Sequence, residues 1–144
     1  MSVCLETARL ILRDYVPEDL DAYFRLKTDE ETMYYLQDIR LSSREEAERE
    51  FAEVLADAVS PDRRFYFLHM EWKDTGEQVG SIGYTVREAA PPGKLVDAGY
   101  FSYRKFWGQG YMTEALRRLL AFAFEEDGVY RFSTGCLTEN RGSE

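Results

Sequence analysis

The sequence predicts a mixed α/β (α+β) fold, in which a mostly antiparallel sheet is flanked by helices. Helical runs separate a first short strand from three consecutive strands that have short connections. A glycine loop and an amphipathic helix then lead from the third of these strands to a last one. Strands joined by short loops pair antiparallel, whereas a strand–helix–strand unit pairs parallel. With 144 residues, 44% of them hydrophobic, the chain is expected to form one domain, residues 1–144.

The first half of the chain is predicted to hold one strand and two or three helices. Arg9–Arg13 is typical of a short strand. Pro17, followed by two acidic residues, predicts the start of a helix, because proline and acids both favour a first turn. A short helical segment is expected around Glu30–Leu36. Ser42 and Ser43 each precede a glutamate by three residues, a pattern that predicts a capped helix reaching about Val59.

Strands dominate the second half. Phe65–Trp72 and Gln78–Val86 are predicted to pair through a short turn, and the prolines of Ala89–Gly93 separate them from a third strand, Leu95–Tyr103. Apolar residues at helical spacing predict a helix over Thr113–Glu125. A last strand is expected over Tyr130–Leu137, before a loop into another helix.

Composition argues against several classes of function. The net charge of −9 and a pI near 4.7 disfavour nucleic acid as the main partner. Cys4 and Cys136 have no CxxC neighbour, which fits a reducing cytosol better than a disulfide framework or a zinc site. His69, the only histidine, lies within a strand-like run and is interpreted as structural. Without a signal pattern or an apolar run of membrane-spanning length, a cytoplasmic protein without membrane contact is expected.

The most informative segment is Trp107–Ala115, which reads Trp-Gly-Gln-Gly-Tyr-Met-Thr-Glu-Ala. Two glycines one residue apart let the backbone approach a ligand closely. The helix that follows offers unpaired N–H groups and the positive end of its dipole, which suit phosphate oxygens. The segment matches neither the Walker pattern GxxxxGK[ST] nor an early GxGxxG, since Thr113 stands at the sixth position. It therefore predicts a site for a phosphorylated cofactor, with a simple tight turn as the structural alternative.

The pattern resembles the GCN5-related N-acetyltransferase (GNAT) superfamily, in particular its RimJ/RimL-type branch. The resemblance is carried by Asp97–Tyr100 and Phe106–Ala115, and supported by Glu6–Arg13, Gly80–Tyr84 and Asn140–Ser143 in the expected order. Trp107 stands where the broad superfamily prefers Arg or Gln, and Met112 where it prefers a small residue. The family continues with a helix and two strands, so the chain is expected to lack these last elements.

The resemblance implies the GNAT fold, acetyl-CoA as cosubstrate and no metal. Backbone amides of the glycine loop would hold the pyrophosphate, which assigns cofactor binding to Trp107, Gly108, Gln109, Gly110, Tyr111, Met112 and Thr113. Exposed backbone groups of Phe101 and Tyr103 are expected to pair with the pantetheine arm in a gap before the last strand. The side chain of Asn140 is expected to contact the pantetheine arm as well.

The implied reaction is direct acetyl transfer to a neutral primary amine. It needs a base for the ammonium proton, donors for the oxyanion and an acid for the thiolate. By position, Asp97 is the candidate base and Ser143 the candidate acid, and a backbone N–H near Phe101 is expected to meet the oxyanion. The acceptor, whether a protein N-terminus, a polyamine, an amino acid or an aminoglycoside, is left open.

Two alternatives to an enzyme remain at this point. One is a non-catalytic acyl-CoA-binding or interaction module on a GNAT scaffold. The other is an assembly partner, because a sheet without its last strands would expose an edge that could pair with a second copy in a homodimer.

Overall fold

The computed structural model describes residues 2–34, 36–37 and 39–133, and a six-stranded sheet forms its centre. The strands are β1 (Cys4–Glu6), β2 (Leu10–Asp14), β3 (Phe65–Trp72), β4 (Gln78–Ala90), β5 (Gly93–Ser102) and β6 (Val129–Ser133). Their order in the sheet follows the chain. Neighbours from β1 to β5 are antiparallel, and β5 and β6 are parallel. The predicted mixed, mostly antiparallel sheet is confirmed.

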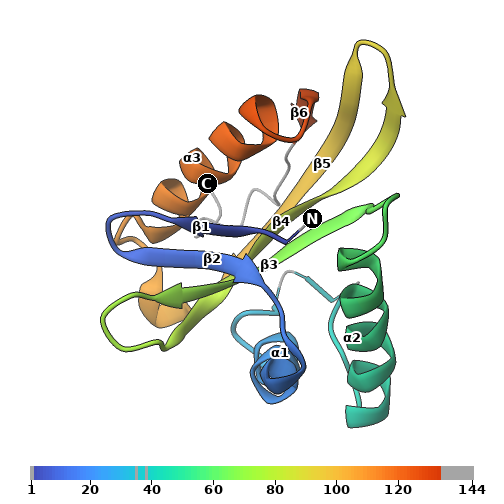
Figure 1. The fold of residues 1–144 in the computed structure, drawn as a ribbon. Coiled ribbons are helices and arrows are strands. Elements are labelled where there is room, and N and C mark those ends of the chain that lie inside the picture. The colour runs from blue at the N-terminus through green and yellow to red at the C-terminus, as the bar shows by residue number, and fades with distance from the viewer. Residues whose placement is uncertain (1, 35, 38, 134–144) are drawn as a thin grey trace.

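Helices cover both faces of this sheet (Figure 1). After the short turn η1 (Pro17–Asp19), α1 (Leu20–Thr28) and α2 (Arg44–Ala58) lie on one side; after η2 (Arg104–Phe106), α3 (Tyr111–Glu125) lies on the other. Two buried apolar clusters reflect this arrangement. The larger joins α3 to inward side chains of all six strands, and the smaller joins α1 and α2. Alternate residues of β3 serve the two clusters, Tyr66 and Leu68 the larger and Phe67 the smaller.

The start of α2 follows from its sequence. The Ser43 hydroxyl accepts a hydrogen bond from the Glu46 N–H (3.2 Å), so the predicted cap is confirmed. Ala47, Phe51 and Val54 recur at helical spacing and are buried. The helix ends at Ala58, one residue before the predicted end.

Two segments of the first half differ from the prediction. Cys4–Glu6 forms a strand that was not predicted, because the Thr7 N–H donates to the Leu10 carbonyl (2.9 Å) and turns the chain back onto β2. The described residues of Glu30–Leu36 form turns and not a helix. There the Asp29 carboxylate accepts from the Thr32 N–H (3.0 Å) and hydroxyl (2.6 Å), which closes a turn after α1.

The second half is closer to the prediction, but its boundaries differ. β4 and β5 extend to a tight turn at Pro91–Pro92, so the prolines lie inside a long hairpin. α3 begins at Tyr111, two residues earlier than predicted. Within the described residues the last strand is Val129–Ser133, and residues 134–144 lie outside them.

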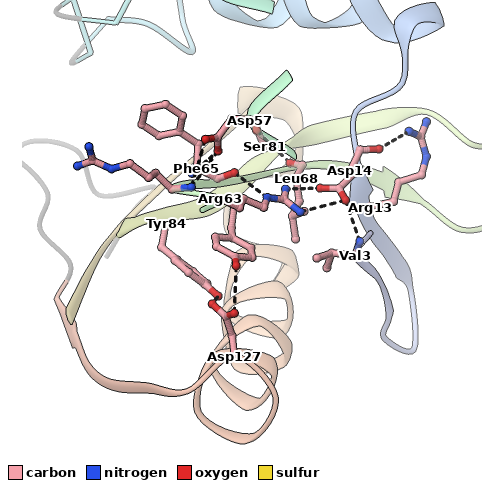
Figure 2. A network of polar contacts seen from close by, with 12 residues as sticks. Val3, Arg13, Asp14, Asp57, Arg63, Phe65, Leu68, Ser81, Tyr84 and Asp127 are labelled. Atoms are coloured by element: carbon pink, nitrogen blue, oxygen red, sulfur yellow. Dashed lines mark hydrogen bonds and ion pairs between the residues drawn. The ribbon is translucent and has the colours of Figure 1, made fainter. Parts of the chain in front are cut away.

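Buried polar contacts anchor the far end of α3 to the sheet (Figure 2). The Asp127 carboxylate, 5% exposed, follows α3 and accepts hydrogen bonds from the hydroxyls of Tyr66 (3.0 Å) and Tyr84 (2.5 Å). Lys94 of β5 donates to the same carboxylate at 2.7 Å. These contacts set the position of α3 on the sheet, and thereby of the glycine loop at its other end. No helix in the described part of the chain is long and apolar enough to cross a membrane.

Candidate functional site

The loop between β5 and α3 has the backbone that its two glycines predict. Gly108 (φ 74°) and Gly110 (φ 81°) both adopt the left-handed conformation that disfavours other residues. A Cβ at Gly108 would find no atom within 4 Å, so the loop is open there. Gly110 is the N-cap of α3 and brings no side chain to cap the first turn. The first-turn N–H groups lack acceptors inside the helix, which suits them to an anion.

Side chains of the loop turn inward and shape it. The Trp107 indole donates to the Ser102 carbonyl (3.0 Å), and the Gln109 amide donates to the Lys105 carbonyl (2.6 Å). Tyr111 is buried edge-on against Phe106. Met112 is half-buried against the larger core cluster, whereas Thr113 is exposed. The loop therefore exposes its backbone at the two glycines, beside the exposed side chains of Gln109 and Thr113.

The register of β5 corrects one expectation about backbone groups. The N–H of Tyr103 donates to the Val79 carbonyl (3.0 Å), and its carbonyl accepts from the Phe106 N–H (3.0 Å). Backbone groups alternate sides along a strand, so Phe101 also faces β4. Even-numbered residues face the β6 side, as the bond from the Lys94 N–H to the Gly128 carbonyl (2.9 Å) shows. The expected exposure of the Phe101 and Tyr103 backbone groups is therefore wrong by one residue.

A hollow of about 420 Å³ lies between the sheet and the helices α1 and α2. Gly83 of β4 is paired with Gly99 of β5, so two neighbouring positions on this face carry no side chain. Side chains from β5 stand on either side, Asp97 toward one end and Phe101 toward the other. The hollow is thus formed by a cross-strand glycine pair under two helices.

Asp97, the predicted base, lines this hollow. Its Oδ2 accepts from Arg87 Nε at 2.5 Å, and its side chain is 41% exposed. Its second oxygen, Oδ1, forms no hydrogen bond with any of the described residues. Asp97 is paired across the sheet with Ser133, the last described residue of β6. The other predicted contacts at this edge, Asn140 and Ser143, lie outside the described residues.

Comparison with known proteins identifies the family of this chain. The acetyltransferase (GNAT) domain family matches residues 9–144. The chain belongs to the GNAT acetyltransferase family. The uncharacterized N-acetyltransferase YoaA of Bacillus subtilis (strain 168) is 28% identical over 96% of this chain and 76% of its own length.

Solved structures agree on the fold of this GNAT chain. A GNAT-family acetyltransferase from Bacillus anthracis is 20% identical, with a TM-score of 0.76 over 96% of this chain and 76% of its own. The ribosomal α-N-protein acetyltransferase RimL, solved with coenzyme A, is 19% identical, with a TM-score of 0.77 over 98% and 78%. The GNAT fold is confirmed, RimL is one of the structures that share it, and the chain is an acetyl-CoA-dependent acetyltransferase by family.

Sequence reasoning missed three residues that line the hollow of this GNAT chain. Glu50 of α2 accepts from the Tyr23 hydroxyl (2.6 Å) and from Lys27 Nζ (2.8 Å), both on α1. Lys27 is nearly buried, with 8% of its side chain exposed. In sequence these residues look like ordinary polar positions of two helices, and only the packing of α1 against α2 brings them over the sheet. The spacing of Tyr23 and Lys27, four residues apart on one helix face, was the available signal.

His69 lies on the same sheet face, in a second, polar hollow of about 560 Å³. It is buried, with Nδ1 3.4 Å from Gln78 Nε2, Nε2 3.7 Å from Glu71 Oε1, and its ring edge-on to Tyr15. Burial, the largest cause, and the charge of Arg13 lower the pKa of His69 below its usual 6.5, against the opposing effect of Asp19 and Glu71.

This lowered pKa predicts that stability falls on acidification. Below about pH 6.5 the unfolded chain takes up a proton at His69 more readily than the folded chain, so the stabilisation present above that pH is lost as pH falls. Urea unfolding at pH 7.5 and 5.5 should show a larger loss for the native chain than for His69→Gln. Equal losses in the two proteins would contradict the prediction.

Proposed function

We propose that this GNAT chain transfers the acetyl group of acetyl-CoA to a primary amine bound in the hollow beside Asp97. One observation carries the proposal: β5 forms a wall of the hollow and leads directly into the left-handed glycine loop at the start of α3. A single strand therefore connects a phosphate-binding backbone to a cavity of substrate size.

The loop residues fit acetyl-CoA. Amides from Gly108 to Thr113 would hold the pyrophosphate, because the N-cap glycine leaves the first turn of α3 uncapped by its own side chain. The register favours even-numbered residues of β5 beyond its pairing with β6, such as Tyr100, as the backbone partners of the pantetheine amides. Asn140 is proposed to contact the same arm, as the family resemblance implies. When bound, acetyl-CoA supplies the thioester.

Charges in the hollow support a primary amine as the acceptor. Two carboxylates, Glu50 and Asp97, line the hollow and offer oxygens that can accept hydrogen bonds from an amine. Each already pairs with a protein cation, Lys27 and Arg87, so the hollow carries no excess negative charge. This balance favours an acceptor with one amine, such as a peptide N-terminus or a small monoamine, over a polyamine.

The proposed role of each residue in acetyl transfer follows from where that residue lies. Asp97 is proposed to accept the ammonium proton on Oδ1, while Arg87 holds Oδ2. The oxyanion is proposed to contact a backbone N–H near Phe101 that faces the β6 side, since the N–H of Phe101 itself faces β4. Ser143 is proposed to donate a proton to the departing thiolate, as in the family pattern.

Calorimetric titration with acetyl-CoA, with ATP as the comparison ligand, tests the proposal first. We expect acetyl-CoA to bind and ATP to bind far more weakly, because ATP lacks the pantetheine arm. Acetyl transfer is then measured on peptides with free and blocked N-termini and on monoamines. Binding without transfer to any amine would favour the alternative of a non-catalytic acyl-CoA-binding module.

The substitution Asp97→Asn tests the assignment of Asp97 as the general base. We expect kcat to fall by about a hundredfold, the usual contribution of a positioned general base, with acetyl-CoA affinity unchanged. Glu88→Gln, an exposed carboxylate of the same hairpin, is the matched control and should keep full turnover. Full turnover by Asp97→Asn across the pH range would remove the assignment.

A further inference from the structure

Arg9 and Glu114 lie 105 positions apart in the chain and meet beside the glycine loop. Arg9 Nε donates to Glu114 Oε1 at 2.8 Å, and the backbone N–H of Arg9 donates to Oε2 at 2.9 Å. The Thr7 hydroxyl donates to the same Oε2. The turn between β1 and β2 therefore holds the first turn of α3 through three hydrogen bonds to one carboxylate.

The Arg9 guanidinium also reaches the loop itself. Its Nη1 donates to the Gln109 carbonyl at 3.1 Å, and its Cζ lies 4.1 Å from the centre of the Tyr111 ring. Between these contacts, Nη2 is the nearest atom to the Cβ position of Gly110, at 3.4 Å. Arg9 thus contacts the loop before, at and after its second glycine.

The bond to the Gln109 carbonyl determines where the next N–H points. The peptide unit between Gln109 and Gly110 is planar and trans, so its C=O and N–H point in opposite directions. Arg9 holds the carbonyl toward the β1–β2 turn, and the Gly110 N–H is directed away from that turn. An anion at the start of α3 needs this N–H to remain on its side of the loop.

Glu114 completes the arrangement. It stands in the first turn of α3, where an unpaired carboxylate would compete with a phosphate for the positive end of the helix. Partial burial opposes its charge, but hydrogen bonds from Thr7 and Arg9 outweigh this and lower the pKa of Glu114 below its usual value. The carboxylate stays charged, is neutralised by Arg9, and fixes the guanidinium at the loop.

We propose that Arg9 and Glu114 are positioning residues, which hold the Gln109–Gly110 peptide in the orientation that receives the pyrophosphate of CoA. The inference rests on the proposed function, since it names the residues that prepare its phosphate site. Neither side chain contacts the reacting atoms; both act through one peptide unit.

Two conservative variants test this role. Arg9→Lys keeps the charge but cannot bond Glu114 and Gln109 with a planar fork, and Glu114→Gln keeps the shape but removes the charge. By calorimetry we expect each to weaken CoA binding by about tenfold, the effect of one charge-assisted hydrogen bond. Pantetheine, which lacks phosphates, should bind each variant as it binds the native chain, because the affected peptide contacts only the pyrophosphate.

Lys73→Gln is the matched control. Lys73 Nζ donates to the Thr7 carbonyl (2.8 Å) and pairs with Glu6 (3.2 Å), so it holds the same turn from the side that does not touch the loop. Its affinities for CoA and pantetheine should equal those of the native chain. Thr7→Val removes the hydroxyl bond to Glu114 together with the bond that the hydroxyl accepts from the Leu10 N–H (2.9 Å). It is a second variant should Glu114→Gln fail to fold, and should weaken CoA binding by about threefold.

Two results would overturn the inference. One is native CoA affinity in folded Arg9→Lys together with Glu114→Gln or Thr7→Val. The other is an equal loss of CoA and pantetheine binding, which indicates general destabilisation. Failure of the folded native chain to bind CoA would instead overturn the proposed function, and this inference with it.

Discussion

Gly110→Val is expected to weaken CoA binding on the order of a hundredfold, the largest effect on cofactor affinity predicted for a single substitution in this chain. Gly110 has a φ of 81°, a conformation that a β-branched residue adopts only at considerable cost. Its Cβ would also lie 3.4 Å from Arg9 Nη2. The loop must leave its conformation, and the N–H groups at the start of α3 would then no longer converge on the pyrophosphate.

The matched control is Gly76→Val in the turn between β3 and β4. Gly76 has a φ of 75°, so the substitution introduces the same kind of backbone strain away from the loop. We expect the two variants to lose similar stability in urea, while only Gly110→Val loses affinity in a calorimetric titration with CoA. Native affinity in Gly110→Val would show that the loop does not bind the cofactor.

Asp127→Asn is expected to lower the free energy of unfolding by about 3 kcal/mol, the low end for breaking a buried ion pair. The substitution keeps the shape of the side chain but removes the charge opposite Lys94, whose own side chain is 27% exposed. It also replaces one of the two oxygens that accept hydrogen bonds from Tyr66 and Tyr84 (Figure 2). Since a small domain has only about 5–15 kcal/mol of stability, this loss is a large fraction of the total.

Urea unfolding measures the loss, with two variants for comparison. Tyr84→Phe removes one hydroxyl and should lower the free energy of unfolding by about 1 kcal/mol. Lys105→Gln removes an exposed pair with Glu77 and should change it by less than about 1 kcal/mol. Asp127→Asn with native stability would mean that the network around α3 contributes little.

Local chemistry explains the part of the fold that the sequence predicted. A serine hydroxyl reaches an N–H three residues away, so the start of α2 at Ser43 depends on a few neighbouring residues. The left-handed loop at Gly108 and Gly110 likewise depends on the missing Cβ atoms of those residues. A run of aromatic and other apolar residues was enough to predict β3 with its observed bounds, Phe65–Trp72. The short helix expected near Glu30 was wrong, since turns stand there, one of them closed by the Asp29 carboxylate.

Long-range pairing explains what could not be predicted. The side to which the Phe101 backbone faces depends on the pairing of β5 with β4, and a shift of one residue reverses it. The hollow beside Asp97 exists because Gly83 and Gly99, sixteen positions apart, become neighbours only in the sheet. Glu50 and Lys27 join it only when α1 packs on α2.

The kind of site could be predicted without the structure: a glycine loop at a helix start, preceded by a strand that carries Asp97. Each of these features depends on residues close together in the chain, where hydrogen-bond reach and backbone conformation are set locally. The tertiary structure decided which backbone groups face the cofactor, which side chains surround the acceptor, and that Arg9 reaches the loop from the far end of the chain. Such choices depend on the summed burial of many residues, which favours one register and one packing over the others.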